Sequence, residues 1–213
     1  MKIIYEIFRV IGTVTGYPFN WLFFKKKFYY ENKKSSSRFI KGGAVIISNH
    51  YNPLDYVSNV FVVFPRKLNV VASEDAFRNR FMSFGMKFWG GIMADRRTFS
   101  LKFTDISADV AKAGGLVQIF PEGHNTPDGE IKKFYPSYIL IAIKAGVPIV
   151  PIVSDGRYGF FKRLHVVIGD KIEISDYLDV NNYTRDDVYR ANGQIRNKVL
   201  ELKAQLDKNA GNI

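Results

Sequence analysis

His50 and Asp55 are the residues of this chain whose types and spacing are most informative about chemistry. They lie five positions apart and follow the apolar run Ala44–Ile47, which is typical of a buried strand. Pro53 suits the first turn of a helix, because its missing N–H and fixed φ are tolerated there. We therefore expect the imidazole on the loop that leaves the strand and the carboxylate in the helix that follows. A histidine oriented by an aspartate can then act as a general base on a hydroxyl group. The spacing alone is also compatible with a loop histidine and a helix-capping aspartate.

A second polar loop follows the apolar run Leu116–Phe120. The residues Pro121–Glu130 are rich in proline, glycine and polar side chains, and such loops present backbone N–H groups and side chains to ligands. In open α/β folds, ligands bind in the crevice outside the carboxyl ends of the strands. Both loops are therefore predicted to contribute to a ligand site.

Four blocks of residues occur in order along the chain. They are Asn49-His50 with Asp55, Gly90–Arg96, Phe120–Gly123 and Val147–Pro151. Together they resemble the blocks N-H-x-x-x-x-D, G-x-I-x-x-x-R, F-P-E-G-T-R-S and V-P-I-x-P of the glycerophospholipid acyltransferase family, which includes the 1-acylglycerol-3-phosphate acyltransferases. The resemblance extends from about Gly42 to Ser154, which is over half of the chain.

The resemblance implies an O-acyltransferase that moves a fatty acyl group from an acyl thioester to the hydroxyl of a lysophospholipid. With 1-acylglycerol-3-phosphate as the acceptor, the product is phosphatidic acid. His50 would be the general base, and Asp55 would hold its tautomer and stabilise the imidazolium. The thioester is already activated, so no serine or cysteine nucleophile is required. The candidate substrate-binding residues are Asn49, Arg96, Arg97, Glu122 and Gly123, and Asn49 can instead shape its loop.

One block departs from the family pattern. In the family, the arginine block and the E-G-T-R block bind the phosphate of the acceptor, and the guanidinium of Arg96 suits that role because it forks two charge-assisted bonds. His124 and Asn125, however, stand where the family has Thr-Arg. Lys132 or Lys133 is a candidate to replace the missing arginine at the phosphate. Another lysolipid or a glycolipid acceptor is the alternative.

The composition indicates one globular domain and an anionic partner. The chain has 213 residues, 46% of them hydrophobic, and 31 Lys+Arg against 20 Asp+Glu give a net charge of +11. The absence of cysteine excludes disulfides and thiolate metal sites. One histidine with scattered carboxylates makes no convincing ligand set, and we expect neither a metal nor another cofactor. The basic surface suits either acyl-CoA or an acidic acyl-acyl carrier protein as the donor.

The N-terminal segment indicates which anionic partner to prefer. Its first residues give one polar and one apolar face at helical spacing, Gly16–Pro18 is a predicted break, and an aromatic stretch precedes a cluster of lysines. Charges and the Gly-Tyr-Pro break argue against a signal peptide or a membrane-spanning helix. We predict that residues 1–34 form an amphipathic helical hairpin on an anionic membrane, which places the protein at the cytoplasmic face of the cell membrane as a monotopic or peripheral protein. A pair of helices that covers the enzyme's own core is the alternative.

Nucleic acid is not an expected partner. Nucleic-acid-binding proteins gather basic residues on a recognition element, whereas here these residues lie beside the amphipathic segment. A non-enzymatic basic lipid-binding protein remains a second interpretation.

Strand-like and helix-like segments alternate from residue 42 to the end, which predicts an α/β domain with a mixed, mostly parallel sheet wrapped by helices. The predicted strands are Ala44–Ser48, Leu68–Ala72, Gly91–Ala94, Leu116–Phe120, Ile149–Val153 and His165–Gly169. The predicted helices lie near Pro53–Phe64, Glu74–Trp89, Phe99–Ala113 and Pro136–Ala145, and a closing helix has its apolar face between Val188 and Leu206.

Overall fold

In the computed structural model, which describes residues 2–23, 25–94, 101–160 and 162–211, seven strands form one sheet. The strands are β1 (Lys26–Tyr30), β2 (Ala44–Ser48), β3 (Leu68–Ser73), β4 (Gly91–Ala94), β5 (Leu116–Ile119), β6 (Ile149–Ser154) and β7 (Leu164–Ile168). Their order is β1-β7-β6-β2-β5-β3-β4, and all neighbours are parallel except β6 and β7. The prediction of a mixed, mostly parallel sheet is confirmed.

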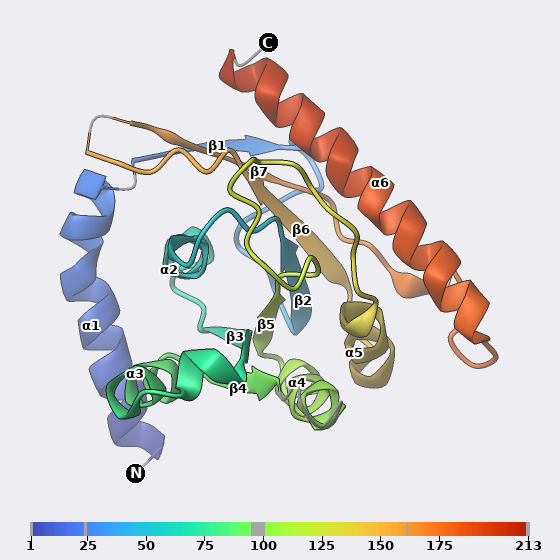
Figure 1. Ribbon diagram of the computed structural model, residues 1–213, viewed down its shortest axis with the longest axis horizontal. Coiled ribbons are helices and arrows are strands. Elements are labelled where there is room, and N and C mark those ends of the chain that lie inside the picture. Colours follow the sequence, from blue (N-terminus) through green and yellow to red (C-terminus); the bar gives the residue numbers. More distant parts are fainter. Residues whose placement is uncertain (1, 24, 95–100, 161, 212–213) are drawn as a thin grey trace.

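Helices cover both faces of this sheet (Figure 1). They are α1 (Lys2–Phe23), α2 (Leu54–Val62), α3 (Arg80–Phe88), α4 (Lys102–Lys112), α5 (Ser137–Ala145) and α6 (Arg185–Ala210), with the short 3-10 helices η1 (Glu74–Phe77) and η2 (Ile174–Asp176). α4, α5 and α6 pack on one face, and α1, α2 and α3 lie on the other side.

The central strands are buried on both faces, as their continuous apolar sequences predict. In β2, Val45 and Ile47 belong to the hydrophobic cluster beneath α4, α5 and α6, whereas Ala44 and Ile46 belong to the cluster beneath α2. This alternation follows from the two-residue period of a strand. The ends of β2, β5 and β6 are thereby fixed side by side, and the polar loops leave from those ends.

The closing helix α6 is confirmed, with boundaries set by its caps. The Thr184 hydroxyl accepts a hydrogen bond from the Asp187 N–H, and the Asp187 side chain accepts one from the Thr184 N–H, which is a capping box. Gly211 ends the helix in the left-handed conformation, with a φ of 70°. The buried face contains Val188, Ala191, Asn192, Ile195, Val199, Leu202 and Leu206.

The N-terminal hairpin prediction is wrong in one respect. The segment begins with an amphipathic helix as expected, but α1 runs without a break through Gly16, Tyr17 and Pro18 to Phe23. Gly16 serves close packing instead of ending the helix, because a Cβ there would lie 3.5 Å from the ring of Phe61 on α2. Pro18 lies inside the helix and leaves it without one backbone N–H donor.

The lysine-rich stretch after α1 is a strand. Lys26–Tyr30 forms β1, which pairs in parallel with β7 at the edge of the sheet. This strand corrects the prediction of a hairpin over residues 1–34, which follows from Lys25, Lys26 and Lys27 resembling a surface cluster. Among the helices of the described ranges, none is long and apolar enough to cross a membrane.

We predict that Ile195→Ala destabilises the protein by about 2–5 kcal/mol, because Ile195 is fully buried under the sheet and the deleted atoms leave a cavity. The matched control, Glu201→Ala on the exposed face of α6, is expected to change the free energy of unfolding by less than about 0.5 kcal/mol. Urea unfolding of both variants measures the difference. Equal midpoints would show that α6 does not contribute to the core as described.

Candidate active site

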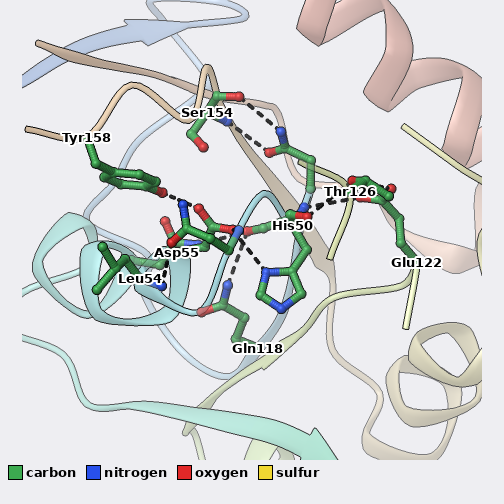
Figure 2. A network of polar contacts seen from close by, with 12 residues as sticks. His50, Leu54, Asp55, Gln118, Glu122, Thr126, Ser154 and Tyr158 are labelled. Atoms are coloured by element: carbon green, nitrogen blue, oxygen red, sulfur yellow. Dashed lines mark hydrogen bonds and ion pairs between the residues drawn. The ribbon is translucent and has the colours of Figure 1, made fainter. Parts of the chain in front are cut away.

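His50 and Asp55 form a direct pair at the carboxyl end of β2. His50 Nδ1 lies 2.9 Å from Asp55 Oδ2, and the same oxygen accepts a hydrogen bond of 2.9 Å from the Asn52 N–H (Figure 2). Asp55 stands in the first turn of α2, where the helix dipole favours a carboxylate, and only 2% of it is exposed. The His50 ring stacks on Phe120 at 3.9 Å between centroids. Because Nδ1 is engaged by Asp55, Nε2 is the nitrogen that remains for a substrate.

Glu122 fixes the backbone on which His50 sits. Its Oε1 accepts a hydrogen bond of 3.1 Å from the His50 N–H, and its Oε2 accepts bonds from the Thr126 hydroxyl and the Lys132 N–H at 3.1 and 2.9 Å. Thr126 returns to the same loop, because its N–H donates to the His50 carbonyl at 2.7 Å. Glu122 is fully buried, so its carboxylate joins the two predicted loops to each other.

Asn49 holds a third loop in place. Its side-chain N–H donates to the Ser154 carbonyl and its side-chain oxygen accepts from the Ser154 N–H, both at 3.0 Å. Asn49 and Ser154 are both buried, and Ser154 is the last residue of β6. The geometry of Asn49 thus corresponds to shaping the loop, the second of the two roles that the sequence leaves open.

Two cavities meet beside the His50 ring. One, of about 370 Å³, is lined by His50 and Tyr56 together with residues of β3, η1 and α3. The other, of about 490 Å³, extends along β3 toward Leu101, Phe103 and Ser137. Phe120, Gly123 and His124 line both cavities. Gly123 has a φ of 73°, a left-handed conformation that favours glycine at this junction.

The other predicted substrate-binding residues are distributed differently. Arg96 and Arg97 lie outside the described residues. His124 and Asn125 are exposed and line the cavity beside His50. Lys132 already pairs with Asp128 and Glu130 at 2.9 and 2.6 Å. Within the described ranges, no group of three or more His, Cys, Asp and Glu could hold a metal ion.

The structure adds a residue that the sequence analysis did not identify. This residue is Tyr158, on the loop between β6 and β7, and its hydroxyl donates a hydrogen bond to Asp55 Oδ1 (Figure 2). None of the four sequence blocks contains this tyrosine. It lies 103 positions from its partner, so local spacing does not predict the contact.

A histidine paired with a buried aspartate lies at the carboxyl edge of a mostly parallel sheet, beside a cavity, in an α/β protein. The Acyltransferase family model matches residues 27–155, and the chain belongs to that family.

Curated relatives are similar over most of this chain. The 1-acyl-sn-glycerol-3-phosphate acyltransferase of Haemophilus influenzae is 28% identical over 151 residues, which cover 68% of this chain and 62% of that protein. A putative 1-acyl-sn-glycerol-3-phosphate acyltransferase of Caenorhabditis elegans is 30% identical over 173 residues, which cover 76% and 59%. The chain therefore spans about three fifths of the length of these two relatives.

The fold is also found in a solved structure. The crystal structure of the 1-acyl-sn-glycerophosphate (LPA) acyltransferase PlsC from Thermotoga maritima matches with a TM-score of 0.61 and 19% sequence identity. The match covers 95% of this chain and 81% of that one. At this identity, the likeness confirms the architecture of the sheet and helices.

We predict that Glu122→Gln lowers both stability and turnover. An amide nitrogen cannot accept a hydrogen bond, so at least one buried donor among the His50 N–H, the Lys132 N–H and the Thr126 hydroxyl loses its acceptor, at about 1–3 kcal/mol. Glu130→Gln on the same loop is the matched control, because its carboxylate is exposed. Thermal melting and acyl-transfer assays measure both variants. If the two behave alike, the buried carboxylate does not fix the loop of His50.

Proposed function

We propose that the chain catalyses O-acyl transfer from an acyl thioester to the hydroxyl of a lysophospholipid such as 1-acylglycerol-3-phosphate, giving phosphatidic acid in phospholipid biosynthesis. The observation that carries the proposal is the 2.9 Å contact between His50 Nδ1 and the buried Asp55, with Nε2 left for the acceptor. Family membership and the relatives' names support the reaction class.

The chemistry follows from the geometry of the pair. His50 Nε2 accepts the proton of the acceptor hydroxyl as its oxygen attacks the thioester carbonyl. A tetrahedral intermediate forms and collapses, the carbon–sulfur bond breaks, and the departing thiolate takes the proton from His50. Asp55 stabilises the imidazolium between these two steps. Acyl-CoA and acyl-acyl carrier protein both supply such a thioester.

The cavities suit a lipid more than a polar metabolite. Apolar residues line the cavity beside His50, among them Val70, Val71 and Met86. Arg96 remains our proposed ligand for the acceptor's phosphate, with Arg97 beside it, and Gly123 lies where both cavities meet. A different lysolipid or glycolipid headgroup is the alternative, because His124 and Asn125 stand at the cavity where the family has Thr-Arg.

Membrane association is supported by the orientation of α1. Ile7, Ile11 and Val14 are 53%, 52% and 53% exposed, although they form the apolar face of the helix. Thr13 and Asn20, on the polar side, are only 2% and 8% exposed and face the protein. An amphipathic helix that turns its apolar face outward matches a helix lying in a membrane interface.

The buried polar side of α1 is satisfied internally. Asn20 Oδ1 accepts a hydrogen bond of 2.6 Å from Lys26 Nζ, and burial lowers the pKa of Lys26 to about 7. Lys26 is thus part of the packing of α1 against β1. Cations left for anionic lipid include Lys25 and Lys27, followed by the exposed Lys33, Lys34 and Lys41. Each basic residue near an anionic surface contributes about 1 kcal/mol. We propose that the protein is a monotopic or peripheral protein of the cytoplasmic leaflet, and we expect no nucleic-acid partner.

We predict that His50→Ala lowers kcat for transfer to 1-acylglycerol-3-phosphate by about 10²–10⁴-fold, because general-base catalysis is lost. Asp55→Asn is expected to be severe but to retain measurable turnover, since the amide occupies the site without stabilising the imidazolium. A radiolabelled acyl-transfer assay with circular dichroism as the folding control measures both. Turnover within a few-fold of wild type in the folded His50→Ala protein would refute the mechanism.

A second prediction tests the membrane helix without removing the edge strand β1. The double substitution Ile11→Asp, Val14→Asp is expected to release the protein from vesicles containing phosphatidylglycerol, because each buried large apolar side chain contributes roughly 1.5–3 kcal/mol. Turnover on membrane-embedded acceptors should fall more than turnover on short-chain soluble ones. Vesicle sedimentation and the two assays provide the measurements.

The matched control is Ile106→Asp, an exposed isoleucine on α4, which packs on the opposite face of the sheet. This variant should sediment with vesicles like the wild-type protein. If the α1 variant also sediments normally, the outward apolar face of α1 does not bind lipid.

A further inference from the structure

Tyr158 completes the hydrogen bonding of the Asp55 carboxylate. Asp55 Oδ2 faces His50 Nδ1 and the Asn52 N–H, and Asp55 Oδ1 accepts from the Tyr158 hydroxyl. Since Asp55 is only 2% exposed, these protein groups replace the water that its carboxylate would otherwise bind. Figure 2 shows the tyrosine approaching Asp55 from the side opposite the imidazole.

The Tyr158 hydroxyl is a donor at neutral pH. Burial, together with the negative charge of Asp55, raises the pKa of Tyr158 far above its ordinary value, so the proton stays on the oxygen. The Ser154 side chain also hydrogen-bonds to Tyr158. The tyrosine is therefore held by one residue at the end of β6 and directs its proton at the carboxylate.

The loop that carries Tyr158 has a fixed shape. Gly156 has a φ of 66°, and a Cβ at that position would lie 2.6 Å from the Tyr51 ring, so the backbone packs directly on this ring. Asp155 Oδ1 accepts bonds from the Arg157 and His165 N–H groups at 3.2 and 3.1 Å. The Tyr158 N–H donates to the Gly156 carbonyl at 3.1 Å. These contacts fix the backbone of the loop that carries Tyr158.

We propose that Tyr158 is a positioning residue of the reaction, which acts through Asp55 to set the orientation and proton affinity of His50. The proposal rests on the proposed function of the His50–Asp55 pair. A hydrogen bond to a carboxylate disperses its charge and restrains its rotation. When the Tyr158 hydrogen bond is removed, Asp55 Oδ1 stays buried but loses this donor. The negative charge of the carboxylate is then concentrated toward His50, so the imidazolium is stabilised more strongly. The neutral base is then less populated near neutral pH and less well aligned.

Other ionisable groups surround His50, and the test must separate them. Asp55 and Tyr56 come from α2, Glu122 and His124 from the loop after β5, and Tyr158 from the loop after β6. Tyr51 follows His50 in the chain and feels the charges of Asp207, Asp155, Asp55 and Glu122. Among the hydrogen bonds given for the described residues, only the one from the Tyr158 hydroxyl reaches Asp55 Oδ1.

The experiment compares Tyr158→Phe with Tyr138→Phe. Both substitutions remove one tyrosine hydroxyl, but Tyr138 is fully buried in α5 and lines neither cavity. The chain has three histidines, so His50 can be resolved and assigned in NMR spectra of the histidine-labelled protein. We expect its titration midpoint to move to higher pH in Tyr158→Phe and to stay at the wild-type value in Tyr138→Phe. Melting temperatures show that both variants are folded.

The kinetic measurement tests the route through Asp55. Tyr158→Phe is expected to lower kcat by roughly 10- to 100-fold, as for the loss of a hydrogen bond to a charged group, with KM within about twofold of wild type. In an Asp55→Asn background, the same substitution is expected to have little further effect, because the carboxylate charge on which Tyr158 acts is already removed. The acid limb of the pH–rate profile should follow the NMR shift.

Two results would overturn the proposal. The first is an identical His50 titration in wild type and Tyr158→Phe, and the second is an equal loss of kcat with and without the Asp55 carboxylate. The failure of the proposed function has a different signature. In that case the wild-type protein transfers no acyl group to any lysophospholipid, while the NMR titration still decides whether Tyr158 acts on the pair.

Discussion

The burial of two carboxylates, Asp55 and Glu122, is the constraint on which the rest of the site depends. A carboxylate removed from water must find hydrogen-bond donors inside the protein, or it destabilises the fold. Asp55 and Glu122 find theirs on loops that leave different strands. The loops after β2, β5 and β6 must therefore be ordered together. The hydrogen bonds that satisfy the two carboxylates also fix the position of the His50 ring.

The parallel arrangement of the sheet makes this possible. β2 lies between β5 and β6 and is parallel to both, so the carboxyl ends of all three strands reach the same edge. Asn49 and Glu122 then connect the first residues of neighbouring loops over distances of about 3 Å. The geometry of the His50–Asp55 pair therefore depends on strand order, and not on any one loop.

The sequence predicted the parts of the site that are local. His50 and Asp55 lie on one strand–loop–helix unit, and the apolar runs defined most strands to within a residue or two. Tyr158 and Ser154 were not predictable, because each meets its partner across more than a hundred positions. β1 was missed for a related reason. Its lysines and aromatic residues resemble a surface segment, and only pairing with β7, far along the chain, makes them a strand.

The sequence correctly predicted an amphipathic helix at α1, but the pattern does not predict which face of the helix packs against the protein. Helix periodicity separates polar from apolar positions, but it does not distinguish an apolar face packed on the protein core from one packed on lipid. Packing decides the question here, because Gly12 and Gly16 allow a close approach to Trp89 and Phe61 on the inward side. Thr13 and Asn20 lie on that same side and find internal hydrogen bonds.

Tyr56 of α2 lines both the apolar cavity beneath α1 and the cavity beside His50. Residues of α2 thus lie between the helix that presents its apolar face outward and the cavity beside the His50 ring.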